Sequence, residues 1–403
     1  MWAIAPANDV GTGKGDEVMG EGAASGAPLP LAPVLELADQ QLPAELKHRC
    51  DGFLPRYFQH LSLTDLKARE PRDLLGAAIA HLRLGDVRAE GTANVHVFNP
   101  DLAAAGWQSP HTVVQIVTDD MPFLVDSVRM VMTAIGLGIH LVIHPMLRVR
   151  REDGRYQGLE EGTANEAWMY LEVDRCDGAR QEALRQRLVD SLDDVRVAVT
   201  DWRPMRDRCD QLAHELEHTV LPLGTGEATR AAQFLRWLSD DHLVFLGYRE
   251  YDFVHEAADE DLIVVAPGTG LGLLRDGRRA EEPHRLSTVT PEARRMVLSP
   301  SVLMLTTANS RSTVCRADYL AYVGVKKFDR DGKVVGERRF LGLYNSDVYR
   351  DSVLDIPLLR DTVAEVLDRA GVRAESHSGR ALRQILETYP RNELFQIDAD
   401  ELF

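Results

Sequence analysis

Hydrophobic spacing switches repeatedly between two periods from Thr112 to Thr200. Runs of β-branched residues alternate with segments in which apolar residues recur every three or four positions, the spacing of a helix face. In order, the segments are strand 112–118, helix 123–135, strand 139–149, strand 166–173, helix 179–192 and strand 195–199. This β-α-β-β-α-β order predicts an α+β, ferredoxin-like domain, in which two helices cover one face of a four-stranded antiparallel sheet.

The patterns on either side of this unit differ from it. The first residues are rich in Gly, Ala, Pro and Ser and cannot bury enough apolar area to offset the entropy of ordering. Helical spacing and strand-like runs of residues predict the secondary structure of the remaining segments. We predict a disordered tail (1–32), a helical N-terminal region (33–90), the ferredoxin-like domain (91–200), a helical linker (201–240), a mixed antiparallel domain (241–352) and a helical segment (353–403).

One turn in the second domain carries a strong local signal. The residues Asp329-Arg330-Asp331-Gly332-Lys333 join two strand-like runs. An Asp-Gly pair between such runs is typical of a tight hairpin, because glycine adopts a positive φ without steric cost. We therefore expect Gly332 at positive φ between two paired strands.

Charge and cysteine usage exclude several classes of partner. The chain has 46 basic and 63 acidic residues, a net charge of −17, which argues against nucleic acid and anionic membranes as partners. Its four cysteines are scattered without a Cys-x-x-Cys pair, so neither a zinc site nor a disulfide framework is expected. No run approaches the roughly 18 apolar residues of a membrane span. These features predict a cytoplasmic protein.

The loop Asp119-Asp120-Met121-Pro122-Phe123 follows a predicted strand and precedes a predicted helix. Carboxylates at such a junction can bind a cation or an amino group. Asp and Asn are also common N-cap residues, because their side chains accept hydrogen bonds from the free N–H groups of a helix's first turn. Both interpretations remain open for this loop.

Three histidines and one glycine-rich segment invite functional hypotheses. His140 and His144 share one face of a predicted strand, and with His96 they are candidate metal ligands, although packed histidines are commoner. Gly268, Gly270 and Gly272 follow a strand-like run, but their Gly-x-Gly-x-Gly spacing differs from the dinucleotide fingerprint. We assign neither a metal site nor a cofactor to this chain.

A second polar loop contains Ser310, Arg311, Ser312 and Arg316. Two guanidinium groups beside hydroxyls can hold an anion, whereas Ser and Thr hydroxyls also tie polar loops together without any ligand. Cys315, in the same loop, has no neighbouring feature that indicates a reactive thiolate. We predict no catalytic residue in the chain.

Several long segments resemble one family. They are TDDMPFLVDSVRM (118–130), NEAWMYLEVD (165–174), FLGYREYDF (245–253), ANSRSTVCRADYLAYVGVKKFDRDGKVVGERRFLGLYNSDVY (308–349) and ILETYPRNELFQIDADEL (385–402). Together they resemble the N-terminal segment of the large bacterial NAD-specific glutamate dehydrogenases.

The resemblance implies more than the patterns do. It implies an ACT-type domain over about 90–200, a PAS-like domain over about 240–350 and a second ACT-type domain after the chain's end. Members of the family oxidise L-glutamate to 2-oxoglutarate with NAD and assemble as homo-oligomers, and their catalytic domain lies further along. We therefore expect a regulatory or architectural portion that is inactive alone. A free-standing ACT/PAS sensor of small ligands is the alternative.

One position departs from the pattern of amino-acid-binding ACT domains. After Asp120 and Pro122, the chain has Phe123 where such domains often carry glycine. A glycine lets a ligand approach the backbone because it has no Cβ. The phenylalanine favours packing over an amino-acid effector at this loop.

Overall fold

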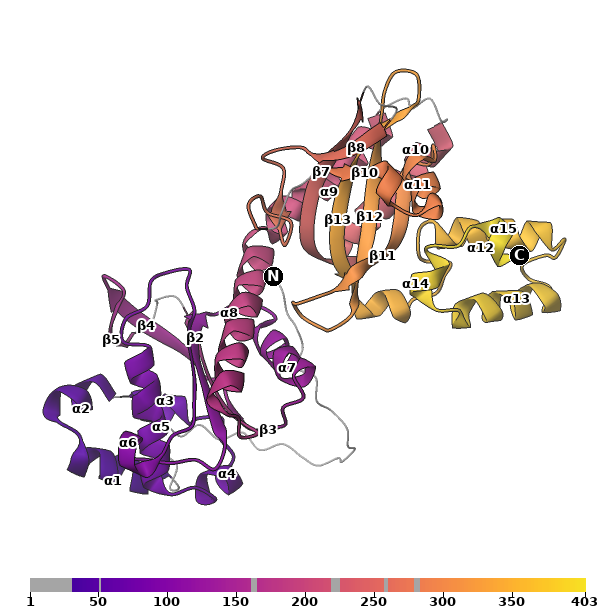
Figure 1. Cartoon of the computed structure of the whole chain (residues 1–403). Coiled ribbons are helices and arrows are strands. Elements are labelled where there is room, and N and C mark those ends of the chain that lie inside the picture. Colours follow the sequence, from indigo (N-terminus) through magenta and orange to yellow (C-terminus); the bar gives the residue numbers. More distant parts are fainter. Residues whose placement is uncertain (1–30, 51, 161–164, 219–224, 257–259, 279–282) are drawn as a thin grey trace.

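The chain folds around two antiparallel sheets that are joined by a layer of helices (Figure 1). The computed structural model describes residues 31–403 apart from residue 51 and the segments 161–164, 219–224, 257–259 and 279–282. The first thirty residues of the predicted tail therefore lie outside the described residues. Leu31 is buried and Ala32 begins the first helix, so the last two residues assigned to that tail belong to the fold.

The first domain contains the elements up to Thr200. In chain order they are α1 (Ala32–Gln41), α2 (Ala44–Cys50), α3 (Phe53–Tyr57), α4 (Leu63–Lys67), α5 (Pro71–Leu84), β1 (Asn94–Phe98), α6 (Leu102–Ala105), β2 (Thr112–Asp119), α7 (Leu124–Ala134), β3 (Ile139–Ile143), β4 (Met146–Glu152), β5 (Arg155–Leu159), β6 (Asn165–Val173) and α8 (Gly178–Thr200). Pro71 at the start of α5 is in the position where a missing N–H has no cost.

The first sheet is covered on both faces. Among the described strands its order is β1-β2-β6-β4-β5, with β3 also paired to β6, and the pairs are antiparallel. Helices α7 and α8 cover one face, as expected, and the N-terminal helices cover the other. The fully buried Trp168 of β6 lies in the core between the sheet and the N-terminal helices, with its ring centroid 5.4 Å from that of Phe53 in α3. The predicted helical region thus packs on the sheet.

The strand predicted at 195–199 is wrong, because these residues form the last turns of α8. The buried stripe of Leu184, Leu188, Leu192 and Val195 keeps helical spacing and outweighs the β-branched alternation. The edge place beside β2 is taken instead by β1, which precedes β2 in the chain. The prediction of a domain of helices and antiparallel strands is therefore confirmed. The edge strand beside β2, however, comes from the segment before β2 and not from residues 195–199.

The second domain follows without a break. Its elements are α9 (Trp202–His218), α10 (Thr225–Trp237), a π-helical turn (Leu238–His242), β7 (Leu243–Glu256), β8 (Glu260–Val265), β9 (Leu271–Gly272), β10 (His284–Arg285), a 3-10 turn (Leu286–Thr288), α11 (Pro291–Leu298), β11 (Leu303–Arg311), β12 (Tyr319–Phe328), β13 (Val334–Tyr344) and a 3-10 turn (Ser346–Tyr349). Their described strands are ordered β10-β8-β7-β13-β12-β11, with β9 beside β7.

The expected hairpin between β12 and β13 is confirmed. Gly332 has a φ of +83°, and the strands on either side pair from Ala321–Gly342 to Phe328–Val334. The Asp329 carboxylate accepts hydrogen bonds from the N–H groups of Asp331 and Lys333, both at 2.9 Å, which fixes the turn.

The helices around the second sheet share its core. Residues of α9 and α10, expected as a linker, pack with one face of the sheet, and residues of the C-terminal helices join the same cluster. These last helices are α12 (Leu359–Arg369), α13 (His377–Thr388), α14 (Arg391–Leu394) and α15 (Ala399–Leu402). None of the helices in the described part of the chain is long and apolar enough to cross a bilayer.

Candidate functional site

The loop Asp119–Phe123, considered as a ligand or interface loop, joins β2 to α7, and its first carboxylate is already engaged. Asp119 Oδ1 lies 2.7 Å from Arg88 Nη2, and its second oxygen accepts a hydrogen bond from Arg196 of α8. Arg196 also donates to the hydroxyl of Thr118 at 2.8 Å. The carboxylate considered for a ligand's amino group is thus neutralised by two guanidinium groups of the protein.

The ion pairs of Asp119 extend into the first domain through Glu166, its partner on β6. Arg88 Nη2 lies 2.8 Å from Glu166 Oε1, and Arg151 Nε of β4 lies 2.6 Å from the same oxygen. The side chains of Arg88 and Glu166 are only 4% and 5% exposed. This alternating series, Arg196–Asp119–Arg88–Glu166–Arg151, is named here the charge chain.

Electrostatics keep both acids of the charge chain ionised. Burial alone would raise the pKa of Glu166, but hydrogen bonds from Arg151 and Arg88 outweigh it and hold that pKa below its ordinary value. Burial likewise opposes ionisation of Asp119, and Arg196 and Arg88 lower its pKa in the same way. The charge chain therefore joins the loop to α8 and β4 at neutral pH.

The N-cap interpretation of the two aspartates is wrong. Helix α7 begins at Leu124, and its N-cap residue is Phe123, whose side chain makes no capping hydrogen bond. Asp120 is exposed, and its backbone N–H donates to the carbonyl oxygen of Asn165 at 3.1 Å. Met121 is half-buried against the core of α7 and α8.

Phe123 takes the backbone conformation of a glycine and uses its side chain for packing. Its φ of 69° and ψ of 1° are left-handed, which is rare for a bulky residue. With Pro122 it lines an apolar cavity of about 190 Å³ beside Val199 of α8 and Phe245 of β7. The loop thus faces the first strand of the second domain.

The glycine-rich segment 268–272 also meets the first domain. The Asp201 carboxylate, directly after α8, accepts a hydrogen bond from the N–H of Gly272 at 2.7 Å and two from Arg275 at 3.0 and 2.6 Å. A Cβ at Gly272 would lie 2.3 Å from the carbonyl oxygen of Leu246, so only glycine fits there. This segment is a joint between domains.

The loop considered as an anion site contacts α7 and α8. The Cys315 N–H donates to the Ser127 hydroxyl at 3.2 Å, and the Thr313 hydroxyl donates to Asp194 at 2.6 Å. Burial raises the pKa of the Cys315 thiol, which disfavours the thiolate. The junction is the name used here for these contacts together with the Asp119–Phe123 loop and the hydrogen bonds of Asp201. An apolar cluster with residues from both domains lies beneath it.

The four residues considered for an anion site have different surroundings. Ser312 donates to the carbonyl oxygen of Val314 at 2.6 Å, and Arg316 donates to that of Tyr344 at 2.6 Å. The Arg311 guanidinium lies 5.0 Å from the centre of the Tyr319 ring, whereas Ser310 is exposed. Their polar groups are largely used in contacts within the second domain.

Two of the three histidines that were considered as metal ligands contact other side chains. His96 stacks on Phe98, with ring centroids 4.2 Å apart, and His140 Nε2 lies 2.8 Å from Asp174. Within the described residues, the group of three metal-ligand side chains lies elsewhere, at His214, Glu217 and His218 of α9. Sequence reasoning missed it, although His-Glu-Leu-Glu-His at 214–218 is a visible His-Glu-x-x-His pattern.

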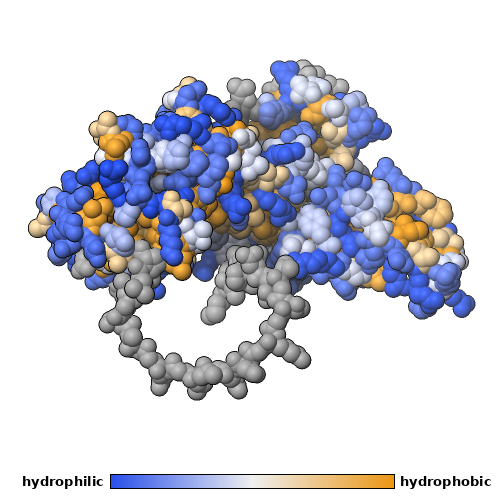
Figure 2. Space-filling view, turned by 90° about the horizontal axis from the view of Figure 1, so that it is seen from below, coloured by the Kyte–Doolittle hydropathy of each residue, from blue (hydrophilic) through white to orange (hydrophobic). Residues whose placement is uncertain are grey.

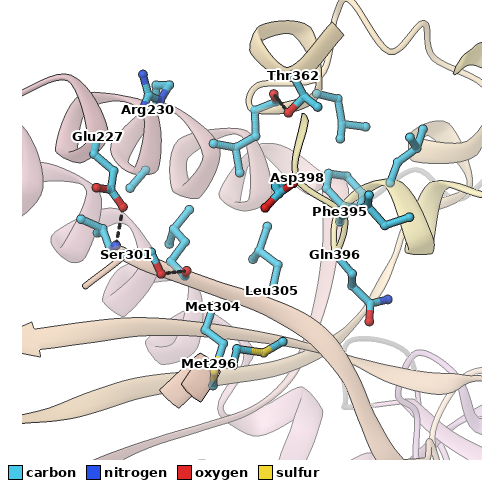
Figure 3. A pocket seen from close by; sticks show the side chains of 17 residues that line it. Glu227, Arg230, Met296, Ser301, Met304, Leu305, Thr362, Phe395, Gln396 and Asp398 are labelled. Atoms are coloured by element: carbon cyan, nitrogen blue, oxygen red, sulfur yellow. Dashed lines mark hydrogen bonds between the residues drawn. The ribbon is translucent and has the colours of Figure 1, made fainter. Parts of the chain in front are cut away.

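A larger cavity of about 480 Å³ lies between α10, β11 and the C-terminal helices (Figure 3). Its walls are mostly apolar, with Glu227 and Arg230 at one end and Gln396 at the other. Glu227 accepts a hydrogen bond from the N–H of Val302 at 2.7 Å, and Asp398 caps α15. These features suit a binding cavity and bring together no nucleophile with a base.

Two family models match the chain. The model described as glutamate dehydrogenase, ACT1 domain, matches residues 53–188, and the model described as glutamate dehydrogenase, helical motif 1, matches residues 356–403. The first range includes part of the N-terminal helices together with the first sheet. The match confirms the prediction of an ACT-type domain, over a range that begins at residue 53 and not at about 90.

The chain is also similar to curated proteins called NAD-specific glutamate dehydrogenase. That of Pseudomonas aeruginosa is 37% identical over 362 residues, which are 87% of this chain and 22% of the relative. The Halomonas elongata protein is 34% identical over 92% of this chain and 24% of its own length. The Mycobacterium tuberculosis protein is 29% identical over 82% of this chain and 20% of its own length. The chain thus spans about a fifth to a quarter of these relatives, and it belongs to the NAD-specific glutamate dehydrogenase family as a counterpart of the N-terminal segment.

Proposed function

We propose that this chain is the architectural and regulatory N-terminal portion of an NAD-dependent glutamate dehydrogenase. The enzyme would convert L-glutamate, NAD and water to 2-oxoglutarate, ammonium and NADH through residues outside this chain. The junction carries the proposal. Gly272 and Cys315, which lie in segments that drew functional hypotheses from the sequence, make hydrogen bonds there that join the two domains. Phe123 of the first domain lines a cavity there with Phe245 of the second.

The described residues do not fit the dinucleotide that the family's name implies. A dinucleotide loop needs glycines that open directly into a helix, whose N-terminus receives the pyrophosphate. After Gly272, the chain turns into Leu273 and Leu274, which are buried in the junction cluster, and α11 begins only at Pro291. We therefore place NAD with other parts of the enzyme.

For the second domain we propose a PAS-like fold. Its first strand, β7, pairs with its last, β13, at the centre of an antiparallel sheet, and α11 lies in the connection between β8 and β11. This arrangement supports a sensor-type scaffold. The alternative function is a free-standing ACT/PAS sensor of a small ligand. The cavity in Figure 3 is the observation that supports this alternative.

We also propose that the chain forms homo-oligomers in the cytoplasm. Figure 2 shows an apolar area at the end formed by the C-terminal helices, where Ile385 and Phe403 are 61% and 67% exposed. Contiguous exposed apolar surface is typical of interaction sites. The four cysteines are free, which supports a reducing compartment. An amino acid is the effector class that the ACT-type domain suggests.

The purified chain should form no NADH from glutamate and NAD, because its described residues bring together no catalytic group and no dinucleotide loop. Absorbance at the NADH band, compared with a mock purification and with a full-length family enzyme, checks this. Turnover above the mock sample would refute the proposal. Saturable micromolar binding of a small ligand that is lost on filling the Figure 3 cavity, by Ala231→Phe, would favour the sensor function instead.

A further inference from the structure

One exposed face of α9 brings together three side chains that commonly bind metals. His214, Glu217 and His218 occupy positions i, i+3 and i+4, which are neighbours on a helix surface. One ligand atom from each lies within 4.8 Å of the others, and the two imidazole centroids are 4.1 Å apart. All three are exposed, so an ion from solution reaches them without opening the fold.

Two contacts orient these side chains before any ion arrives. His218 Nδ1 lies 2.8 Å from the backbone carbonyl oxygen of His214, so Nδ1 carries the proton in this contact and the neutral ring keeps the Nε2 lone pair free. Arg236 of α10 donates to both oxygens of Glu217, at 3.0 and 2.9 Å. Such supporting contacts are typical of metal ligands.

The acidic residue next to His214 indicates whether this site is suited to hydrolysis or only to metal binding. In a catalytic His-Glu-x-x-His site, the glutamate after the first histidine acts as the general base toward the metal-bound water. Here that residue is Glu215, and its carboxylate lies 3.5 Å from Arg338 of β13. Glu215 is thus directed toward the sheet of the second domain and is paired with a cation.

We propose that His214, Glu217 and His218 bind one divalent transition-metal ion of the zinc type. Two imidazoles and a carboxylate suit Zn²⁺, and water would complete its coordination. All three ligands belong to α9, so the bound ion would stabilise this helix, whose buried face packs in the core of the second sheet. The role is structural or regulatory binding.

Isothermal calorimetry with Zn²⁺ on the untagged, chelator-stripped chain tests this. We expect one ion per chain, with His214→Ala and His218→Ala each weakening the affinity at least about tenfold. His140→Ala is the matched control, since it removes an exposed histidine that is paired with a carboxylate in the first domain. It should leave the affinity unchanged.

Circular dichroism of each variant verifies folding, which these exposed positions should not disturb. The proposal is overturned if Zn²⁺ shows no saturable binding, if both α9 variants bind like the wild type, or if His140→Ala weakens binding as much as they do.

Discussion

Replacing Glu166 by alanine should lower the free energy of unfolding by about 3–5 kcal/mol, because it removes a buried counter-charge from the buried Arg88 and the partly buried Arg151. Arg88 keeps Asp119, but Arg151 loses its carboxylate partner in the charge chain. Urea unfolding followed by circular dichroism measures the loss. Glu182→Ala is the control, because it breaks an exposed, solvent-screened pair with Arg185 and should change the free energy of unfolding far less. Equal effects of the two substitutions would contradict the assigned role.

Substitution of Glu166 should also change how the stability of the protein depends on pH. The folded-state pKa values of Glu166 and Asp119 lie below their ordinary values. Their contribution to stability is therefore complete above the ordinary carboxylate pKa and is lost as the pH falls through the lowered values. Glu166→Gln should consequently be less stable than the wild type at pH 7, and the difference should shrink on acidification from about pH 5 to pH 2. A difference that stays constant over this range would be inconsistent with the charge chain.

Replacing Trp168 by alanine should cost about 3–5 kcal/mol, the usual range for truncating a buried aromatic residue. The indole is fully buried, packs on His81 with centroids 5.1 Å apart, and donates from Nε1 to Glu166 at 3.1 Å. A Cβ at Gly85 would lie 2.2 Å from the indole, which shows how closely the end of α5 approaches it. Truncation therefore leaves a cavity between the N-terminal helices and the first sheet.

Urea unfolding is again the measurement for Trp168→Ala. Tyr319→Ala serves as its control, because that ring is 48% exposed and its loss should cost less than about 1 kcal/mol. A cost below 1 kcal/mol for Trp168→Ala would mean that the helices and the sheet do not share one core.

Local signals in the sequence predicted the local structure well. The Gly332 turn was predictable because the positive φ depends on the glycine itself and on its immediate neighbours. The run Thr112–Thr118 became β2, since its β-branched residues are buried on both faces of the sheet. At 195–199 the same signal failed, because packing of α8 against the core of the first sheet overrides alternation over five residues.

The role of the junction depends on contacts that no local pattern contains. Asp119 meets Arg196 across 77 residues of sequence, and Asp201 meets Arg275 across 74. Only the fold shows that these aspartates are paired, so the sequence left ligand binding and capping open for Asp119. The α9 histidines are the opposite case, because their i, i+4 spacing was readable and was overlooked.

Calorimetry with the common amino acids on the wild type and on Phe123→Gly tests most directly whether the Asp119–Phe123 loop serves the junction. The side chain of Phe123 occupies the space beside the left-handed turn, and Asp119 is already paired with two arginines. We predict no micromolar binding by the wild type. Binding by the glycine variant alone would agree with the steric role of Phe123. Micromolar binding by the wild type that the substitution leaves unchanged would contradict the architectural role.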